Sequence, residues 1–344
     1  MQRAWNRRGP LAALLLPLAT LFAIGTRIRR ALYRVGWLRS ERLPVRVIVV
    51  GNLVAGGAGK TPTVLALVAM LRGKGYAPGV VSRGYGGRQR GVMAVEPRTP
   101  ARLCGDEPLL LRRRAGVPVF VGRDRVAAAR ALLREHPDVD LIVSDDGLQH
   151  LRLAHDVAVL VFDERGAGNG WMLPAGPLRE PLPPVVPLNS LVLYNAPQTS
   201  TPLPGWIVQR RLSGAVALQD WWQGQAALPA TLDALKGRTL VAAAGMGRPD
   251  RFFAMLREAG LDVAALPLPD HCDYATLPWP PDAADVVVTE KDAVKLDPAR
   301  MGATRIWVAA LDFVLPAVFD AQLLRLLGPP SRSALAPAHG NSIA

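Results

Sequence analysis

The sequence predicts an α/β fold built on a parallel sheet with helices on both faces. Apolar, strand-like runs alternate with helix-like segments between residues 45 and 162. This alternation is typical of a parallel sheet that is buried on both sides. A glycine-rich loop joins the first of these strands to the first helix. The chain has 344 residues, which is long enough for two domains. Its composition, 50% hydrophobic and 20% charged, excludes an intrinsically disordered protein.

The glycine-rich loop is the most informative segment of the chain. It follows the apolar run 45–50, precedes the helical run 63–71, and reads Gly56-Gly57-Ala58-Gly59-Lys60-Thr61. Glycines let backbone N–H groups turn toward an anion, the lysine reaches the outer phosphates and the threonine hydroxyl holds Mg²⁺. The full pattern places glycine six residues before the lysine, where this chain has Val54. The strand before and the helix after still indicate a nucleoside triphosphate site on a P-loop NTPase-like sheet.

The remaining elements of this sheet follow in order. Predicted strands cover 76–81, 117–121, 140–144 and 157–162, and predicted helices cover 106–115 and 125–135. The proline-rich stretch 174–187 is expected to loop over the surface.

A second, smaller α/β set begins near residue 236. Its predicted elements are strand 239–244, helix 251–259 and strand 286–289. We therefore expect a P-loop domain over 47–235, a smaller C-terminal domain over 236–328 and a disordered tail over 329–344.

The N-terminal 46 residues carry most of the charge. They contain ten arginines and one acid, Glu41, which accounts for +9 of the net charge of +13. The rest of the chain is nearly balanced and has no recognisable nucleic-acid module, which argues against a basic nucleic-acid-binding protein. The two cysteines are too few for a disulfide scaffold and suit a reducing compartment.

The same segment holds an uncharged apolar run, 11–24, flanked by arginines. It is shorter than the roughly 20 residues that span a bilayer. A basic start and an apolar core also fit a secretory signal, but arginine follows closely and no small-x-small cleavage site fits. We expect a membrane-associated helix that lies in or dips into the leaflet, with its arginines on anionic headgroups. The alternative is an ordinary buried helix with a solvated basic face.

Several polar residues have both a chemical and a structural interpretation. Asp145 follows the strand 140–144, where an acid of a P-loop enzyme holds Mg²⁺, although a loop aspartate can also cap a helix. Asp106 fits an N-cap, His271 fits a surface histidine, and Arg125 fits a solvated charge run.

Seven motifs in one order give these residues a common context. They are Gly51-Asn52-Leu53 before Gly56-Gly57-x-Gly59-Lys60-Thr61-Pro62, Ser82-Arg83-Gly84-Tyr85, Gly105-Asp106-Glu107-Pro108, Asp145-Asp146-Gly147-Leu148-Gln149-His150, Leu173-Pro174-Ala175-Gly176-Pro177-Leu178-Arg179-Glu180-Pro181, Pro269-Asp270-His271 and Thr289-Glu290-Lys291-Asp292. Over residues 10–325 this set resembles the tetraacyldisaccharide 4′-kinase family of Gram-negative bacteria. Each motif alone is weak, and seven in register are specific.

The resemblance implies transfer of the ATP γ-phosphate to the 4′-hydroxyl of a tetraacylated glucosamine disaccharide 1-phosphate, which forms lipid IVA in lipid A biosynthesis. It implies ATP and Mg²⁺ as cofactors and a position on the cytoplasmic face of the inner membrane, where the acylated substrate lies. We expect a monomer with no nucleic-acid partner. The alternative from another class is a membrane-associated P-loop ATPase or GTPase in assembly or targeting.

The resemblance also implies roles for individual residues. Asp106 matches the catalytic base and His271 the histidine that orients it, so the P-loop domain and the C-terminal domain must close to complete the site. Lys60 and Thr61 serve the phosphates and Mg²⁺, and Arg125 neutralises phosphate charge. The remaining expected site residues are Asp145, Asp146 and Glu180 around the metal, and His150.

Overall fold

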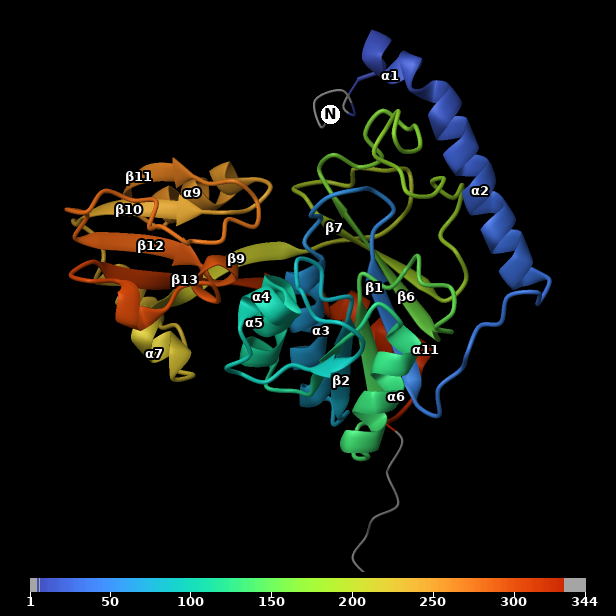
Figure 1. The fold of residues 1–344 in the computed structure, drawn as a ribbon, viewed down its shortest axis with the longest axis horizontal. Coiled ribbons are helices and arrows are strands. Elements are labelled where there is room, and N and C mark those ends of the chain that lie inside the picture. The colour runs from blue at the N-terminus through green and yellow to red at the C-terminus, as the bar shows by residue number, and fades with distance from the viewer. Residues whose placement is uncertain (1–4, 6, 331–344) are drawn as a thin grey trace, which may run out of the picture.

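The computed structural model describes residue 5 and residues 7–330. Within these residues the chain forms an eight-stranded and a five-stranded sheet, which lie side by side (Figure 1). In spatial order the larger sheet contains β3 (Met93–Ala94), β4 (Val119–Val121), β2 (Pro78–Ser82), β5 (Leu141–Asp145), β1 (Arg46–Gly51), β6 (Val157–Asp163), β7 (Ser190–Asn195) and β8 (Trp206–Ile207).

The larger sheet is parallel except at its β3 edge, which pairs antiparallel with β4. Strand β1 lies between β5 and β6, and its register places Val50 opposite Asp145. The carboxyl ends of β1 and β5 therefore meet at the same edge of the sheet. The predicted strands of this sheet are confirmed within a few residues, whereas β3, β7 and β8 were not predicted.

Helices cover both faces of this sheet, as predicted. Ile48 and Val50 share one apolar cluster with α3 (Lys60–Gly73), α5 (Asp106–Ala115) and α11 (Ala317–Leu327). Val47 and Val49 point to the other face, where α6 (Arg125–Glu135) packs. This division follows from the alternation of side chains along β1. The short helix α4 (Ala101–Cys104) precedes α5.

The proline-rich segment is more than a surface loop. Leu178 is buried and shares an apolar cluster with Phe162 and Tyr194 of β6 and β7. The stretch therefore covers the part of the sheet face that α6 does not reach. The expectation of a surface loop is corrected in this respect, because its apolar residues fill a space that no helix occupies.

The second sheet contains, in spatial order, β11 (Asp262–Pro267), β10 (Thr239–Ala244), β12 (Asp285–Thr289), β13 (Arg305–Val314) and β9 (Gln209–Ala217). Its helical segments are α7 (Leu218–Trp222), α8 (Pro229–Asp233), α9 (Pro249–Glu258), α10 (Glu290–Ala293) and η2 (Pro298–Arg300). The predicted elements 239–244, 251–259 and 286–289 are confirmed.

The predicted domain boundary near residue 235 falls inside this second layer. Strand β9 lies before this boundary in the chain, yet it pairs antiparallel with β13, which lies after it. At the other end of the layer the chain returns through α11 to the apolar cluster of the larger sheet. The ranges 47–235 and 236–328 therefore remain a prediction as folding units, while the strands of the second sheet begin at Gln209. The predicted disordered tail lies, from residue 331 onward, outside the described residues.

The N-terminal helices α1 (Pro10–Leu14) and α2 (Leu16–Arg34) run along the outside of the molecule (Figure 1). Only Ala12 and Ala19 of these two helices are buried. Their large exposed apolar side chains are Leu11, Leu14, Leu18, Leu21, Phe22, Ile24 and Ile28. The alternative of an ordinary buried helix is therefore wrong. Of the helices in the described part of the chain, none combines the length and apolar character needed to cross a bilayer.

The return of α11 to the larger sheet makes a prediction about stability. Leu323 is fully buried on this helix, so Leu323→Ala is expected to lower the free energy of unfolding by about 2–5 kcal/mol. Val318 on the same helix is 65% exposed, so Val318→Ala is expected to change it by no more than about 0.5 kcal/mol. Urea unfolding followed by tryptophan fluorescence measures both. Equal effects would show that α11 does not pack on the sheet.

Candidate active site

The glycine-rich loop leaves β1 and leads directly into α3, which begins at Lys60. Gly56 and Gly59 have φ angles of +99° and +92°, which L-residues rarely adopt. Three side chains hold the loop carbonyls. Asn52 Nδ2 donates to Gly56 O at 3.2 Å, Arg165 Nη2 to Gly57 O at 3.1 Å and Asn195 Nδ2 to Ala58 O at 3.0 Å. With its carbonyls held from outside, the loop is shaped to present N–H groups and the α3 N-terminus to an anion.

Two cationic side chains lie against the Asp146 carboxylate beside this loop. Lys60 Nζ lies 3.7 Å and Arg179 Nη1 3.1 Å from Asp146 Oδ1. Burial alone would raise the pKa of Asp146, but Lys60 and Arg179 outweigh it and hold the pKa below its usual value. The backbone of Asp146 is left-handed, with φ of 49°, which turns the chain sharply after β5. Asp146 is therefore ionised and holds the side chain of Lys60.

Asp145 ends β5 and is 1% exposed. Ser82 Oγ donates to its Oδ2 at 3.4 Å, whereas Oδ1 has no hydrogen-bond partner among the described residues. Burial raises the pKa of Asp145 to about 7, with a contribution from Glu107 and opposition from Lys60. A buried carboxylate oxygen that lacks a partner, next to a phosphate loop, fits a ligand of Mg²⁺.

The predicted acids do not form a ready-made metal cage. No group of three or more His, Cys, Asp or Glu side chains in the described ranges is close enough to hold a metal ion. Glu180 is buried, and its carboxylate lies 2.7 Å from Arg30 Nη2 of α2. A site of one or two carboxylates still fits Mg²⁺, which usually keeps several waters and substrate phosphates as ligands. The placement of Glu180 at the metal remains a prediction, and its observed partner is the N-terminal helix.

Arg125 and His150 lie behind Asp146. Arg125 is 5% exposed, so the solvated charge run is the wrong interpretation. Its Nη2 donates to Asp146 O at 3.3 Å, and its backbone N–H donates to His150 Nε2 at 3.3 Å. Burial, reinforced by Arg125, lowers the pKa of His150 to about 4, so this imidazole is neutral. Arg125 thus supports the turn that carries Asp146.

Asp106 and His271 are brought into contact from positions 165 residues apart, with Asp106 Oδ2 2.9 Å from His271 Nδ1. Asp106 is the first residue of α5, is buried, and accepts the backbone N–H of Glu107 at Oδ1. Burial would raise the pKa of Asp106, but the hydrogen bond to His271 and the charge of Lys291 bring it below its usual value. The same hydrogen bond raises the pKa of His271. This geometry is that of a carboxylate held ionised and oriented by an imidazole.

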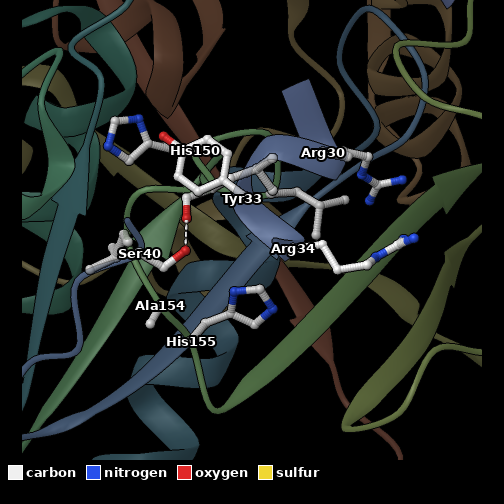
Figure 2. Close-up of a pocket in the computed structure, with 10 residues that line it drawn as sticks. Arg30, Tyr33, Arg34, Ser40, His150, Ala154 and His155 are labelled. Carbon is white, nitrogen blue, oxygen red and sulfur yellow. Dashed lines mark hydrogen bonds between the residues drawn. The ribbon is translucent and has the colours of Figure 1, made fainter. Parts of the chain in front are cut away.

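A cavity of about 480 Å³ lies between α2 and the segment after Asp146 (Figure 2). Figure 2 shows side chains from α2 and from residues 150–155 around it. Ser40 Oγ donates to Leu151 O at 2.7 Å at its edge. Its lining residues are Arg30, Tyr33, Arg34, Ser40, Leu148, His150, Leu151, Leu153, Ala154 and His155. His150 therefore contacts this cavity on one side and Arg125 on the other.

Three charged residues of this region had no role in the sequence prediction, namely Glu107, Arg179 and Lys291. Arg179 and Lys291 lie in two of the seven motifs, and each contacts an expected site acid. The signal for Lys291 was its place two residues after the apolar strand 285–289. The sequence gives no way to see which carboxylate such a lysine meets.

Comparison with known proteins decides the family. The family description Tetraacyldisaccharide-1-P 4′-kinase matches residues 11–328. The chain belongs to this kinase family. The predicted family and the predicted enzyme class, a kinase, are thereby confirmed.

Individual relatives of this kinase agree. It is 56% identical over 336 residues to the tetraacyldisaccharide 4′-kinase of Methylibium petroleiphilum, which covers 96% of this chain and 94% of that protein. It is 46% identical over 333 residues to that of Janthinobacterium, with 95% of each chain covered. Its fold is similar to LpxK from Aquifex aeolicus in complex with ATP, with a TM-score of 0.75, 27% identity, and coverage of 92% of this chain and 100% of that one.

The pKa values of two half-buried histidines of this kinase are expected to be shifted in opposite directions. His150 should stay neutral above pH 5, because its pKa is lowered to about 4, whereas His271 should titrate above its ordinary value of 6.5. Imidazole NMR titration measures both. Asp106→Asn should lower the pKa of His271, because it removes the carboxylate partner, and leave His150 unchanged as an internal control. An unshifted His271 in Asp106→Asn would show that the pair does not form in solution.

Proposed function

We propose that this kinase transfers the γ-phosphate of ATP to the 4′-hydroxyl of a tetraacylated glucosamine disaccharide 1-phosphate and so forms lipid IVA. The observation that carries the proposal is the contact between Asp106 and His271. It occurs in a protein of this family that also has a glycine-rich loop after β1 of the larger sheet. Two relatives named tetraacyldisaccharide 4′-kinase are each 56% identical to this chain, over 336 and 331 residues.

The phosphate loop binds the triphosphate. The backbone N–H groups of Gly56 to Gly59 and the N-terminus of α3 face the phosphates, and Lys60 pairs with the outer ones. Asp146 Oδ1 lies 3.7 Å from Lys60 Nζ and so positions this ammonium group beside the loop. Arg125 supports Asp146 from behind through its carbonyl. Phosphoryl transfer needs little covalent help from the protein, so positioning and charge are its main contributions.

Thr61 and Asp145, with Asp146 nearby, would hold Mg²⁺. The unpartnered Oδ1 of Asp145 and the buried Thr61 hydroxyl at the first turn of α3 fit that role. When bound, the ion neutralises charge on the β- and γ-phosphates.

Asp106 is the base. A carboxylate whose pKa is held below its usual value is ionised at neutral pH and accepts the proton of the sugar hydroxyl at Oδ2 or Oδ1. As the O4′–P bond forms, the bond between the γ-phosphorus and the bridging oxygen breaks and ADP leaves. His271 fixes the orientation of Asp106 and stabilises its charge until the proton arrives.

The N-terminal helices bring the enzyme to its substrate. A lipid with four acyl chains stays in the bilayer, and α2 presents leucines with arginines at 27, 29, 30 and 34. This combination binds an anionic leaflet in the interfacial plane. The cavity beside α2 has Arg30 and Arg34 at its rim and suits the phosphorylated sugar end, since about 480 Å³ cannot hold four chains. Because ATP is an intracellular substrate, the proposal includes a position on the cytoplasmic face of the inner membrane. The Asp106–His271 pair and the phosphate loop come from one chain, which supports a monomer as the working unit.

The catalytic pair makes a prediction about rate. Asp106→Ala is expected to lower kcat by about 10²–10⁴-fold, because the general base is lost. His271→Ala should have a smaller effect, and the double variant should be no slower than Asp106→Ala, because the two residues act as one unit. The assay is transfer from γ-labelled ATP, with Mg²⁺ and detergent, to the tetraacyl disaccharide 1-phosphate. Additive losses would contradict the pair. ATP hydrolysis without a labelled lipid would favour a membrane-associated ATPase.

The exposed face of α2 makes a prediction about membrane binding. Replacing Leu18 and Leu21 together by serine is expected to weaken binding to phosphatidylglycerol-containing vesicles by about tenfold or more, because two apolar side chains no longer leave water. Leu188→Ser is the matched control, because Leu188 is 91% exposed on a different part of the surface. Vesicle co-sedimentation measures both. Equal binding by all three proteins would remove α2 as the docking surface.

A further inference from the structure

The motif Thr289-Glu290-Lys291-Asp292 has no role in the reaction described so far. It forms the end of β12 and the short helix α10, which packs against α5 of the larger layer. Glu290 and Asp292 are buried. The motif therefore lies where the second layer contacts the helix that begins with Asp106.

Lys291 points its ammonium group into a cluster of carboxylates. Its Nζ lies 3.9 Å from Asp106 Oδ2, 3.5 Å from Glu107 Oε1 and 3.1 Å from Asp270 Oδ1. Two of these acids start α5, and the third directly precedes His271. One ammonium thus neutralises charge from both layers at the place where the Asp106–His271 pair forms.

The neighbours of Lys291 in the motif fix its position. Asp292 accepts the backbone N–H of Gly245 at 3.1 Å and the Thr289 hydroxyl at 2.7 Å. Glu290 accepts Arg114 Nη1 at 2.7 Å and Trp221 Nε1 at 3.2 Å. Because Arg114 lies in the last turn of α5, the motif contacts this helix at both ends.

The distance from Lys291 to Asp106 suits a base. At 3.9 Å the ammonium favours the ionised carboxylate by its charge, while Oδ2 keeps a lone pair free for a proton. A direct hydrogen bond would compete with the incoming hydroxyl. Removal of Lys291 would leave Asp106, Glu107 and Asp270 close together, with His271 and Lys295 as the remaining groups that favour the ionised Asp106.

We propose that Lys291 is a positioning residue of the phosphoryl transfer, whose ammonium keeps Asp106 ionised and ties α5 to the loop that carries His271. This inference rests on the proposed role of Asp106 as the base. The Lys291 side chain is largely buried and does not belong to the phosphate loop, so its effect appears in kcat and its pH dependence and not in the KM for ATP.

The pH dependence of the transfer reaction tests this proposal. Removal of a nearby cation disfavours the charged carboxylate, so in Lys291→Met the acid limb of the kcat profile should move to higher pH. We expect kcat at pH 6 to fall by about tenfold or more and kcat at pH 8.5 to fall less, since the base is ionised there in both proteins. Lys291→Arg should restore the wild-type limb. The groups that face Asp106 and contribute to this profile are Cys104, Glu107, Asp270, His271, Lys291 and Lys295.

Arg114→Met is the matched control. It removes the second contact between α5 and α10 but leaves the charges around Asp106 in place. It should keep the wild-type acid limb whatever its effect on stability. If Lys291→Met does not fold, Lys291→Gln replaces it, because the amide retains a donor for Asp270. An acid limb that stays in place in the Lys291 variant, or that moves equally in Arg114→Met, overturns the proposal.

Failure of the base assignment is distinguishable from failure of this proposal. If Asp106→Ala retains the wild-type rate, the base is another group, and the proposal for Lys291 fails with it. If Asp106→Ala is inactive and Lys291→Met has the wild-type pH profile, only the role of Lys291 is wrong. Imidazole NMR gives a readout without turnover. Loss of the Lys291 charge should raise the pKa of His271, and an unshifted His271 would also count against the proposal.

Discussion

The parallel pairing of β1 with β5 is the constraint on which the site depends. Its register sets Val50 opposite Asp145, so the phosphate loop and the strand-end carboxylate leave the sheet at the same edge. Both strands are buried on both faces, and a shift of one residue would turn their apolar side chains away from α3 on one face and α6 on the other. The packing of the core therefore also fixes the position of the glycine-rich loop relative to Asp145.

Buried charge around this edge is almost completely paired. Asp146 has Lys60 and Arg179, Glu180 has Arg30, and Asp106 has His271 with Lys291 nearby. Such pairing is required because an isolated charge in a protein interior is costly. Asp145 differs from these acids, because one of its buried oxygens has no hydrogen-bond partner among the described residues. A bound cation at this oxygen would complete that interaction.

The second sheet and the N-terminal helices each add charged residues to this edge of the larger sheet. The second sheet supplies His271 and Lys291, so the contacts that surround Asp106 form where the two layers meet. The α2 helix supplies the basic charge and the exposed leucines, and its Arg30 reaches the buried Glu180. The high net charge of the chain is therefore concentrated in the N-terminal segment, and the rest of the molecule is nearly neutral.

The sequence by itself determined the phosphate loop, the alternation of elements in the larger sheet and the set of motifs that indicates the family. These features are local, because period-2 and period-3.6 patterns and a loop of six residues are complete within short windows. Only the tertiary structure decided that β9 joins the second sheet, that α11 returns to the first, and that Glu180 meets Arg30. It also brought Asp106 to His271 and Lys291, from segments more than 160 residues apart. Such contacts depend on which apolar faces pack together across the whole chain, and a local sequence pattern contains no information about that packing.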